Sequence, residues 1–344
     1  MQVPAVVAAG DRGAAKAIRG ESKAYLAVGE RSLVADAVAV LQRVPEVSEV
    51  MVVGDAERLA KVLGEDAALR AELRKPLTIV PQFRNLYENA WETYRRLLPG
   101  APPEGRDPAT PADAEQPVLY LSADLPFATA QEISAFVRQS LASGVDYALG
   151  LVTEEAMEGF YPEPEKPGIR MAYFNVREGR VRQSNLHLVR PAKLGNRHYV
   201  EEMYENRYQR QLGSVLRIGW RILGRRGGGF AVLLSFLLVH LAGLLDRWGF
   251  RRLADRLRGH LDLARVGGYC GRLLDTTFRF IVTEAGGCAV DIDNDEDFEI
   301  ARQRFREWRA AQEARAERLY GPLPLPERAG VAAPELRIAQ GGEP

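Results

Sequence analysis

Short apolar runs alternate with longer amphipathic segments through the first 150 residues of the 344-residue chain. The apolar runs are bounded by turn residues and predict strands at residues 4–9, 47–53, 77–80 and 118–122. Between them, apolar residues recur at helical spacing and predict helices at residues 33–43, 55–73, 86–98 and 129–141. Such alternation is typical of a mostly parallel sheet with helices on both faces. We therefore predict an α/β fold.

The pattern becomes less regular in the second half of the chain. Further strands are predicted at residues 147–153, 171–177, 180–188, 278–283 and 288–292. Helices are predicted at residues 199–223, 230–260 and 295–317. Two segments rich in proline are expected to lack regular structure, namely a mobile loop over residues 99–116 and a loose tail after Tyr320.

The composition is that of a globular protein with a sizeable core, because 46% of the residues are hydrophobic. Lysine and arginine together number 46, as do aspartate and glutamate, so no overall charge indicates nucleic acid. The two cysteines, Cys270 and Cys288, have neither disulfide-framework nor zinc-site spacing, which fits a reducing, cytoplasmic compartment. The N-terminus runs directly into an apolar strand, so no signal peptide is expected.

The charge is unevenly distributed. Between Arg207 and Arg272 there are 13 arginines, three aspartates, and neither lysine nor glutamate. Within this basic stretch lies a largely apolar run of 16 residues, Phe230 to Leu245, which is shorter than the roughly 20 residues of a membrane-spanning helix. An apolar centre with arginine flanks fits a helix in an anionic membrane interface, and it equally fits a helical hairpin buried in the core or in a dimer interface.

Three segments carry residues suited to phosphate chemistry. The first, Ala8 to Gly13, follows the first strand as Ala-Ala-Gly-Asp-Arg-Gly, whose small residues let backbone N–H groups approach phosphates. In the second, Lys23 precedes a short apolar run and the turn at Gly29, and its ammonium could neutralise charge on a transferring phosphoryl group.

The third segment places Asp124, followed by Leu125 and Pro126, after the strand predicted at 118–122. Ligands of open α/β sheets bind at the carboxyl ends of the strands, and Mg²⁺ prefers one or two carboxylates together with substrate phosphates. Asp124 therefore stands where a metal ligand is needed, although a helix-cap or turn aspartate fits the same position.

These segments occur in order with a late Asp291-Ile292-Asp293 that precedes an acidic helix start. As a set they resemble the MobA-like NTP transferase family, over residues 1–150 and 278–310. The resemblance implies a three-layer, Rossmann-like fold of the GT-A type, with a mostly parallel sheet and here a helical insertion. One departure is that the family loop usually has two adjacent glycines before Gly-Thr-Arg, so the identity of the phosphate-binding basic residue stays open.

The resemblance also implies roles for individual residues. Catalysis would depend on Lys23 and Arg12, with Lys16 as a second phosphate contact, and Mg²⁺ would be bound by Asp124 and Asp293, with Asp291 in support. The residues implied in nucleotide binding are Ala8, Ala9, Gly10, Asp11, Gly13, Gln82 and Ser122. Gln82 is the one expected to read the base, because it follows the third strand.

The acceptor is expected to contact polar residues of the later strands. Our candidates are Arg170, Asn175 and Asn185, although each also fits a solvated strand face. His187 or His198 could line the same pocket. The four histidines are scattered, so a histidine metal cluster is not expected.

The function implied is Mg²⁺-dependent transfer of a nucleoside monophosphate from an NTP, with CTP and GTP both plausible. The acceptor would be a sugar, polyol or lipid-linked phosphate, and pyrophosphate would be released. One alternative is a glycosyltransferase, which usually carries Asp-x-Asp where this chain has Asp124-Leu125-Pro126. Another is a non-catalytic nucleotide-binding or membrane-surface protein. No nucleic-acid recognition motif is present, whereas a homodimer and peripheral contact with the inner membrane face through residues 207–260 stay open.

The chain is accordingly divided into five parts. They are a nucleotide-binding half at 1–150, acceptor-binding strands at 151–206, a basic and apolar helical insertion at 207–277, a return to the core with the second metal aspartate and the terminal helix at 278–320, and a loose tail at 321–344.

Overall fold

The computed structural model describes residues 1–11, 17–197, 261–326 and 336–339. The predicted helices 199–223 and 230–260 lie outside the described residues, as do Arg12, Gly13, Lys16 and His198. In the described ranges, no helix is both long and apolar enough to cross a membrane.

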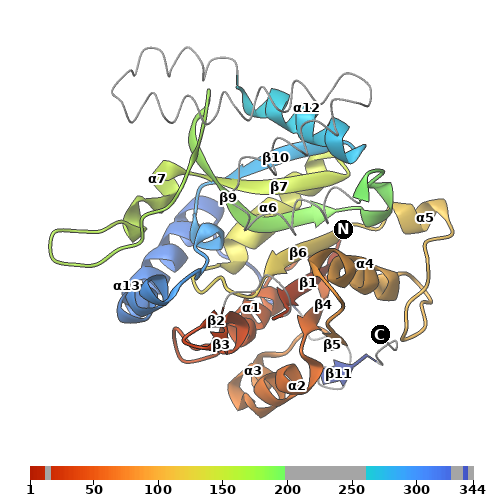
Figure 1. The fold of residues 1–344 in the computed structure, drawn as a ribbon, viewed down its shortest axis with the longest axis horizontal. Coiled ribbons are helices and arrows are strands. Elements are labelled where there is room, and N and C mark those ends of the chain that lie inside the picture. The colour runs from red at the N-terminus through yellow and green to blue at the C-terminus, as the bar shows by residue number, and fades with distance from the viewer. Residues whose placement is uncertain (12–16, 198–260, 327–335, 340–344) are drawn as a thin grey trace.

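A mixed, mostly parallel sheet forms the centre of the molecule (Figure 1). Its strands run in the order β10-β7-β9-β6-β1-β4-β5-β11, and β8 pairs with β9. The pairings of β9 with β6, β7 and β8 are antiparallel, and the other pairings in this sheet are parallel. The strands are β1 (Val3–Ala9), β4 (Val47–Gly54), β5 (Leu77–Pro81), β6 (Val118–Ser122), β7 (Tyr147–Thr153), β8 (Phe174–Val176), β9 (Gly179–Val189), β10 (Phe278–Thr283) and β11 (Leu336–Ile338). The predicted α/β fold with a mostly parallel sheet is confirmed.

A second, smaller sheet lies between β1 and α1 in the chain. It consists of the two-residue strands β2 (Ala17–Ile18) and β3 (Glu21–Ser22), which pair antiparallel. The short 3₁₀ helix η1 (Lys23–Tyr25) follows directly and carries Lys23.

Helices cover both faces of the sheet. They are α1 (Leu33–Gln42), α2 (Ala56–Glu65), α3 (Ala67–Glu72), α4 (Leu86–Leu97), α5 (Pro111–Ala114), α6 (Ala130–Ser143), α7 (Glu154–Met157), α12 (Leu263–Leu274) and α13 (Asp295–Tyr320). Successive residues of β1 face opposite layers, so Val7 belongs to the cluster that α1 and α6 complete, whereas Val6 packs in the cluster that contains Tyr94 of α4. This alternation explains why β1 reads as a continuous apolar run.

Two predicted elements differ from the structure. The helix predicted over 55–73 is two helices, because Asp66 ends α2 and its carboxylate accepts a hydrogen bond from the Leu69 N–H as the N-cap of α3. The strand predicted at 288–292 is wrong, since Gly287–Ala289 form the 3₁₀ turn η4 and the chain then runs extended without pairing in the sheet.

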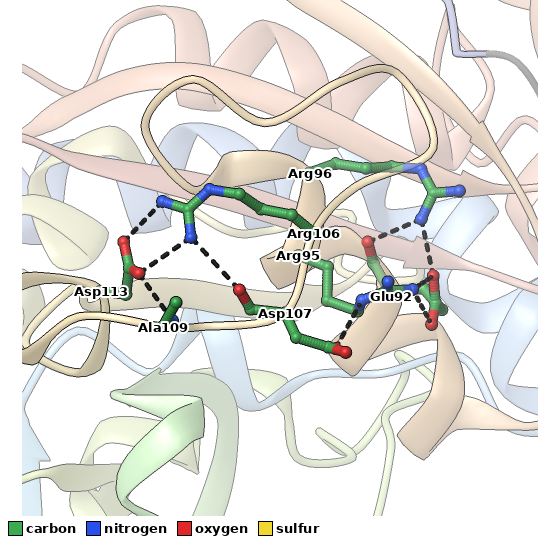
Figure 2. A network of polar contacts seen from close by, with 7 residues as sticks. All are labelled: Glu92, Arg95, Arg96, Arg106, Asp107, Ala109 and Asp113. Carbon is green, nitrogen blue, oxygen red and sulfur yellow. Dashed lines mark hydrogen bonds and ion pairs between the residues drawn. The ribbon is translucent and has the colours of Figure 1, made fainter.

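The loop predicted to be mobile at 99–116 is anchored by polar contacts (Figure 2). Arg106 donates to both carboxylate oxygens of Asp113, at 2.9 and 2.7 Å, and the Ala109 N–H donates to the same carboxylate at 2.9 Å. A second ion pair joins Asp107 to Arg95 of α4 at 3.0 Å. The segment also forms the short helix α5. The prediction of a mobile loop rested on composition, which does not reveal these contacts.

The tail predicted to be loose contains a strand. Residues of β11 pair in parallel with β5, with Leu336 opposite Leu77 and Ile338 opposite Ile79. The Ala339 N–H extends the ladder with a hydrogen bond to the Ile79 carbonyl at 2.8 Å. This short apolar stretch forms a strand because β5 offers an open edge to it.

Candidate active site

The candidate site lies at the carboxyl edge of the sheet. β1 and β6 are adjacent and parallel, and Ala8 pairs in register with Ser122. The turn after β1 and the turn after β6 therefore leave the sheet side by side, which is where open α/β sheets bind ligands. A small pocket opens between them, and its lining consists of Ala8, Ala9, Gly10, Ser22, Lys23, Ala24, Ser122, Ala123 and Asp124.

The side chains of Lys23, Asp124 and Asp293 meet at this pocket. The Lys23 ammonium donates to Asp124 Oδ2 at 3.2 Å and to Asp293 Oδ1 at 2.7 Å. The Lys23 and Asp124 side chains are only 17% and 13% exposed, whereas that of Asp293 is 58% exposed. Three residues that the sequence singled out separately thus form one cluster.

Opposite charges in this cluster outweigh the cost of burial. Burial acts to lower the pKa of Lys23, but the charge of Asp124 and the hydrogen bond to Asp293 raise it above its usual range. Burial acts to raise the pKa of Asp293, yet the hydrogen bond from Lys23 lowers it below its usual range. The cluster therefore holds an ammonium and carboxylate charge together at neutral pH.

The geometry suits a divalent cation held partly by substrate. One cationic atom, Lys23 Nζ, already lies within hydrogen-bond distance of both Asp124 and Asp293, so the two carboxylates face a common point. In the part of the chain that the structure describes, no group of three histidine, cysteine or acidic side chains is arranged to hold a metal. Mg²⁺ commonly takes one or two carboxylates and completes its shell with water and phosphates, and this pair fits that pattern.

Ser122 supports the metal-binding candidate directly. Its hydroxyl donates to Asp124 Oδ1 while Lys23 contacts the other carboxylate oxygen, Oδ2. Asp124 is therefore held at both oxygens. Ser122 lines the pocket as a partner of Asp124, and its expected contact with the nucleotide stays a prediction.

Asp11 and Gln82 are linked by two hydrogen bonds. The Asp11 N–H donates to Gln82 Oε1 at 3.0 Å, and Gln82 Nε2 donates to Asp11 Oδ1 at 2.7 Å. A side chain on Gly10 would crowd this pair, because its Cβ would lie 3.3 Å from both Gln82 Oε1 and Asn89 Nδ2. The expected base-reading residue is thus fixed against the glycine turn.

Arg58 of α2 ties down the chain on both sides of Lys23. Its guanidinium lies 2.5 Å from the Glu21 carboxylate and 4.0 Å from the centre of the Tyr25 ring. It also lies 3.8 Å from Asp11. Arg58 was not predicted from the sequence, where it appears only as one polar residue of an amphipathic helix.

The segment that leads to Asp293 is anchored by a buried carboxylate. Glu132 of α6 accepts hydrogen bonds from Thr283 Oγ1 at 2.9 Å and from the N–H groups of Gly286 and Cys288, both at 3.1 Å. Glu132 was not predicted from the sequence either, because no motif surrounds it. Its one signal is an acidic residue in the first turn of an otherwise apolar helix face.

Arg182 of β9 holds the same segment further on. It donates to the Ala289 carbonyl at 2.9 Å and to Asp291 Oδ1 at 2.6 Å. Burial and the neighbouring charge of Asp293 raise the pKa of Asp291 to about 6, despite the opposing charge of Arg182. Asp291, which was expected to support the metal-binding carboxylates, thus has Arg182 as its ion-pair partner.

The acceptor candidates lie on the β8–β9 hairpin and its approach. Asn175 of β8 pairs in register with Arg180 of β9, Asn185 lies further along β9, and Arg170 is exposed before β8. Their role stays a prediction. His187, in contrast, is partly buried and bonded to the Tyr147 hydroxyl at 2.9 Å, and desolvation lowers its pKa to about 4. His187 thus packs near the start of β7, and its expected place in an acceptor pocket stays a prediction.

The chain was compared with known proteins. No family model matches it, and no curated protein matches it. A solved hypothetical transferase from Thermus thermophilus is similar, with a TM-score of 0.54 and 22% identity over 87% of this chain and 100% of that chain. This likeness shows that the two proteins share a fold.

Two further solved structures match with lower TM-scores. One is a CMP:2-keto-3-deoxy-manno-octonic acid synthetase complexed with CTP, with a TM-score of 0.44 and 10% identity over 89% of this chain and 99% of that chain. The other is a 4-diphosphocytidyl-2C-methyl-D-erythritol synthase from Anaerococcus prevotii, with a TM-score of 0.42 and 10% identity over 89% of this chain and 98% of that chain.

Proposed function

We propose that this protein is a Mg²⁺-dependent nucleotidyltransferase of the MobA-like type, which moves a nucleoside monophosphate from an NTP to a phosphorylated acceptor. The observation that carries the proposal is the position of the Lys23 ammonium between Asp124 and Asp293, beside the glycine turn after β1. A fixed cation and two carboxylates beside a turn of small residues are what phosphoryl transfer needs, because positioning and charge neutralisation lower its barrier.

In the proposed reaction, an oxygen of the acceptor phosphate attacks the α-phosphorus of the NTP. A new P–O bond forms as the bond to the β-phosphate oxygen breaks, and pyrophosphate leaves. The backbone from Ala8 to Asp11 would hold the phosphates, and Lys23 would stabilise the negative charge of the transition state. Arg12, which lies outside the described residues, would add a second positive charge.

Asp124 and Asp293 would hold the metal ion, and Ser122 would orient Asp124 toward it. Bound Mg²⁺ supplies charge neutralisation and alignment of the phosphates. The half-exposed carboxylate of Asp293 is open to the solvent side of the site, where a substrate phosphate can enter.

We further propose that Gln82 reads the base of CTP or GTP, with Asp11 as its partner. Arg170, Asn175 and Asn185 would contact a sugar, polyol or lipid-linked phosphate. Membrane contact through residues 207–260, which lie outside the described residues, remains a proposal. A homodimer also remains a proposal. Cytoplasmic location also remains a proposal.

A glycosyltransferase of the same fold is the second candidate. It would also use metal-binding carboxylates at the carboxyl edge, but it would give the buried Lys23 no partner in the reaction. A non-catalytic nucleotide-binding protein would likewise leave the Lys23–Asp124–Asp293 cluster without a task. The cluster therefore favours nucleotidyl transfer over both alternatives.

The test is pyrophosphate release with Mg²⁺, each of the four NTPs in turn, and a panel of sugar, polyol and lipid phosphates. Asp124→Ala is compared with wild type and with Asp107→Ala, which removes an exposed carboxylate in the 99–116 loop. Acceptor-dependent release that Asp124→Ala loses and Asp107→Ala keeps is the expected result. NTP binding without release across the panel would favour the non-catalytic alternative, and a wild-type protein that binds no NTP would overturn the proposal.

A further inference from the structure

We propose that Arg182 is a positioning residue, which sets the place of the metal-binding Asp293 by holding the chain segment immediately before it. This inference rests on the proposed function, because it assigns Arg182 a task at the same site. It concerns a residue on the central sheet that makes no contact with Asp124 or Lys23 among those described for its side chain.

The guanidinium of Arg182 grips two acceptors that lie two residues apart. Its Nε donates to the Ala289 carbonyl at 2.9 Å, and its Nη2 donates to Asp291 Oδ1 at 2.6 Å. A planar guanidinium offers donors in fixed directions, so two such bonds define the orientation of the segment as well as its distance. Residues 289–291 form no sheet ladder of their own, which makes this grip an important restraint on them.

The base of Arg182 is itself rigid. β9 is bonded to β7 on one side, where Arg182 pairs with Val152, and to β8 on the other, where Val181 pairs with Phe174. Because β9 runs antiparallel to β7, its early residues lie beside the end of β7, at the edge of the sheet where Asp124 follows β6. The side chain reaches the 289–291 segment from a fixed platform and is only 20% exposed.

Core packing buries Val290 and Ile292 beside Asp293, and polar contacts fix the chain on either side of them. Upstream, Glu132 holds the chain only as far as the Cys288 N–H. Downstream, α13 begins with Asn294 as its N-cap, whose side chain accepts from the Asp297 N–H. Arg182 supplies the polar restraint between these two points, so that Asp293 projects toward Lys23 between the segment that Arg182 holds and a capped helix.

Charge adds a second reason for Arg182. Asp291 and Asp293 are close enough that each affects the pKa of the other, and Asp124 contributes to the same field. Without Arg182, the carboxylates would repel one another with Lys23 as the nearest counter-charge. Groups that orient metal ligands typically change metal affinity or activity by about 10- to 100-fold when removed.

The experiment compares Arg182→Ala and Arg182→Lys with Arg180→Ala. Arg180 is the matched control, since it lies two residues earlier on β9 and pairs with Glu154 rather than with the 289–291 segment. Binding of Mn²⁺ is titrated by electron paramagnetic resonance, alone and with each NTP, and pyrophosphate release gives kcat and the Mg²⁺ concentration for half-maximal rate. Thermal unfolding of every variant is recorded in parallel.

We expect Arg182→Ala to weaken Mn²⁺ binding and to raise the Mg²⁺ requirement by about tenfold or more, with a smaller change in Arg182→Lys. Arg180→Ala should leave both unchanged. The Arg182→Lys and Asp291→Asn changes should not add when combined, because they break one contact. If Arg182→Ala does not fold, Arg182→Lys and the double variant decide the matter.

Unchanged metal binding and an unchanged Mg²⁺ requirement in Arg182→Lys, or full additivity with Asp291→Asn, would overturn the assignment. A lower melting temperature with unaltered metal binding would show that Arg182 is only structural. Failure of the proposed function is recognised separately, as a wild-type protein that releases no pyrophosphate, and the Mn²⁺ titration would still test Arg182.

Discussion

The Lys23 ammonium lies 2.7 Å from Asp293 Oδ1, although 270 residues separate the two in the chain. The contact joins η1, near the N-terminus, to the residue before the N-cap of α13. The candidate site is thus built from residues near both ends of the described chain. Because Lys23 contacts both carboxylates, it is the first target for mutation.

Replacing Lys23 with alanine should reduce kcat for pyrophosphate release by about 100- to 1,000-fold, because a charged donor to the developing negative charge is lost. Lys23→Arg should recover part of the rate. Steady-state kinetics over a range of NTP concentrations give kcat and KM, with Lys61→Ala on the exposed face of α2 as the control for loss of a lysine. A higher KM with an unchanged kcat would contradict a role in the transition state.

Replacing Gly10 with alanine should weaken NTP binding by about tenfold, since the new Cβ would press on the Gln82 and Asn89 amides at 3.3 Å and shift them. Isothermal titration with each NTP measures the change. The double variant Gly10→Ala, Gln82→Ala is compared with Gln82→Ala alone to distinguish the causes. If the double variant binds NTP more weakly than Gln82→Ala alone, displacement of Gln82 is not the only cause of the loss.

Glu132→Ala should reduce the free energy of unfolding by about 3 kcal/mol or more, because two buried N–H groups and a hydroxyl would lose their acceptor. Urea denaturation followed by circular dichroism gives the value. Glu132→Gln keeps one acceptor oxygen and should lose less. Equal stability of Glu132→Ala and wild type would show that the 283–288 segment does not depend on this carboxylate.

Stability should depend on pH through Asp36, in the first turn of α1. Burial raises its pKa from 3.8 to about 6, and Oδ2 has no hydrogen-bond partner among the described residues. Between pH 3.8 and about 6, the folded state therefore holds a proton on Asp36 that the unfolded state has lost. This contribution to stability is complete below pH 3.8 and is lost as the pH rises through about 6. At neutral pH the ionised carboxylate is then a cost to folding.

Asp36→Asn should accordingly raise the free energy of unfolding at pH 7.5 by about 1 to 3 kcal/mol and change it little at pH 4. Chemical denaturation at both pH values measures the difference. Glu57→Gln, on the exposed face of α2, controls for loss of one negative charge. Equal gains at both pH values would show that the effect does not come from ionisation.

Local patterns were sufficient to predict most of the fold. The apolar runs that became β1, β4, β5 and β6 are buried on both faces, which is why they stand out as continuous hydrophobic stretches. Errors arose where tertiary contacts overrode local composition, as in the loop that Arg106 and Asp113 anchor (Figure 2) and in β11, which forms because β5 has an open edge.

The candidate residues Lys23, Asp124 and Asp293 were found in the sequence because each follows or precedes a recognisable strand, turn or helix start. Their residue types and order, and the parallel sheet that brings strand ends together, follow from local pattern and from the family resemblance. The sequence revealed neither Glu132 and Arg58 nor the contact of Arg182 with Asp291, which all depend on contacts between residues up to 156 positions apart. Only the packing of α6, α2 and β9 around the site decides which charged side chains meet, because hydrogen-bond partners are selected by distance in space and leave no periodic signal along the chain.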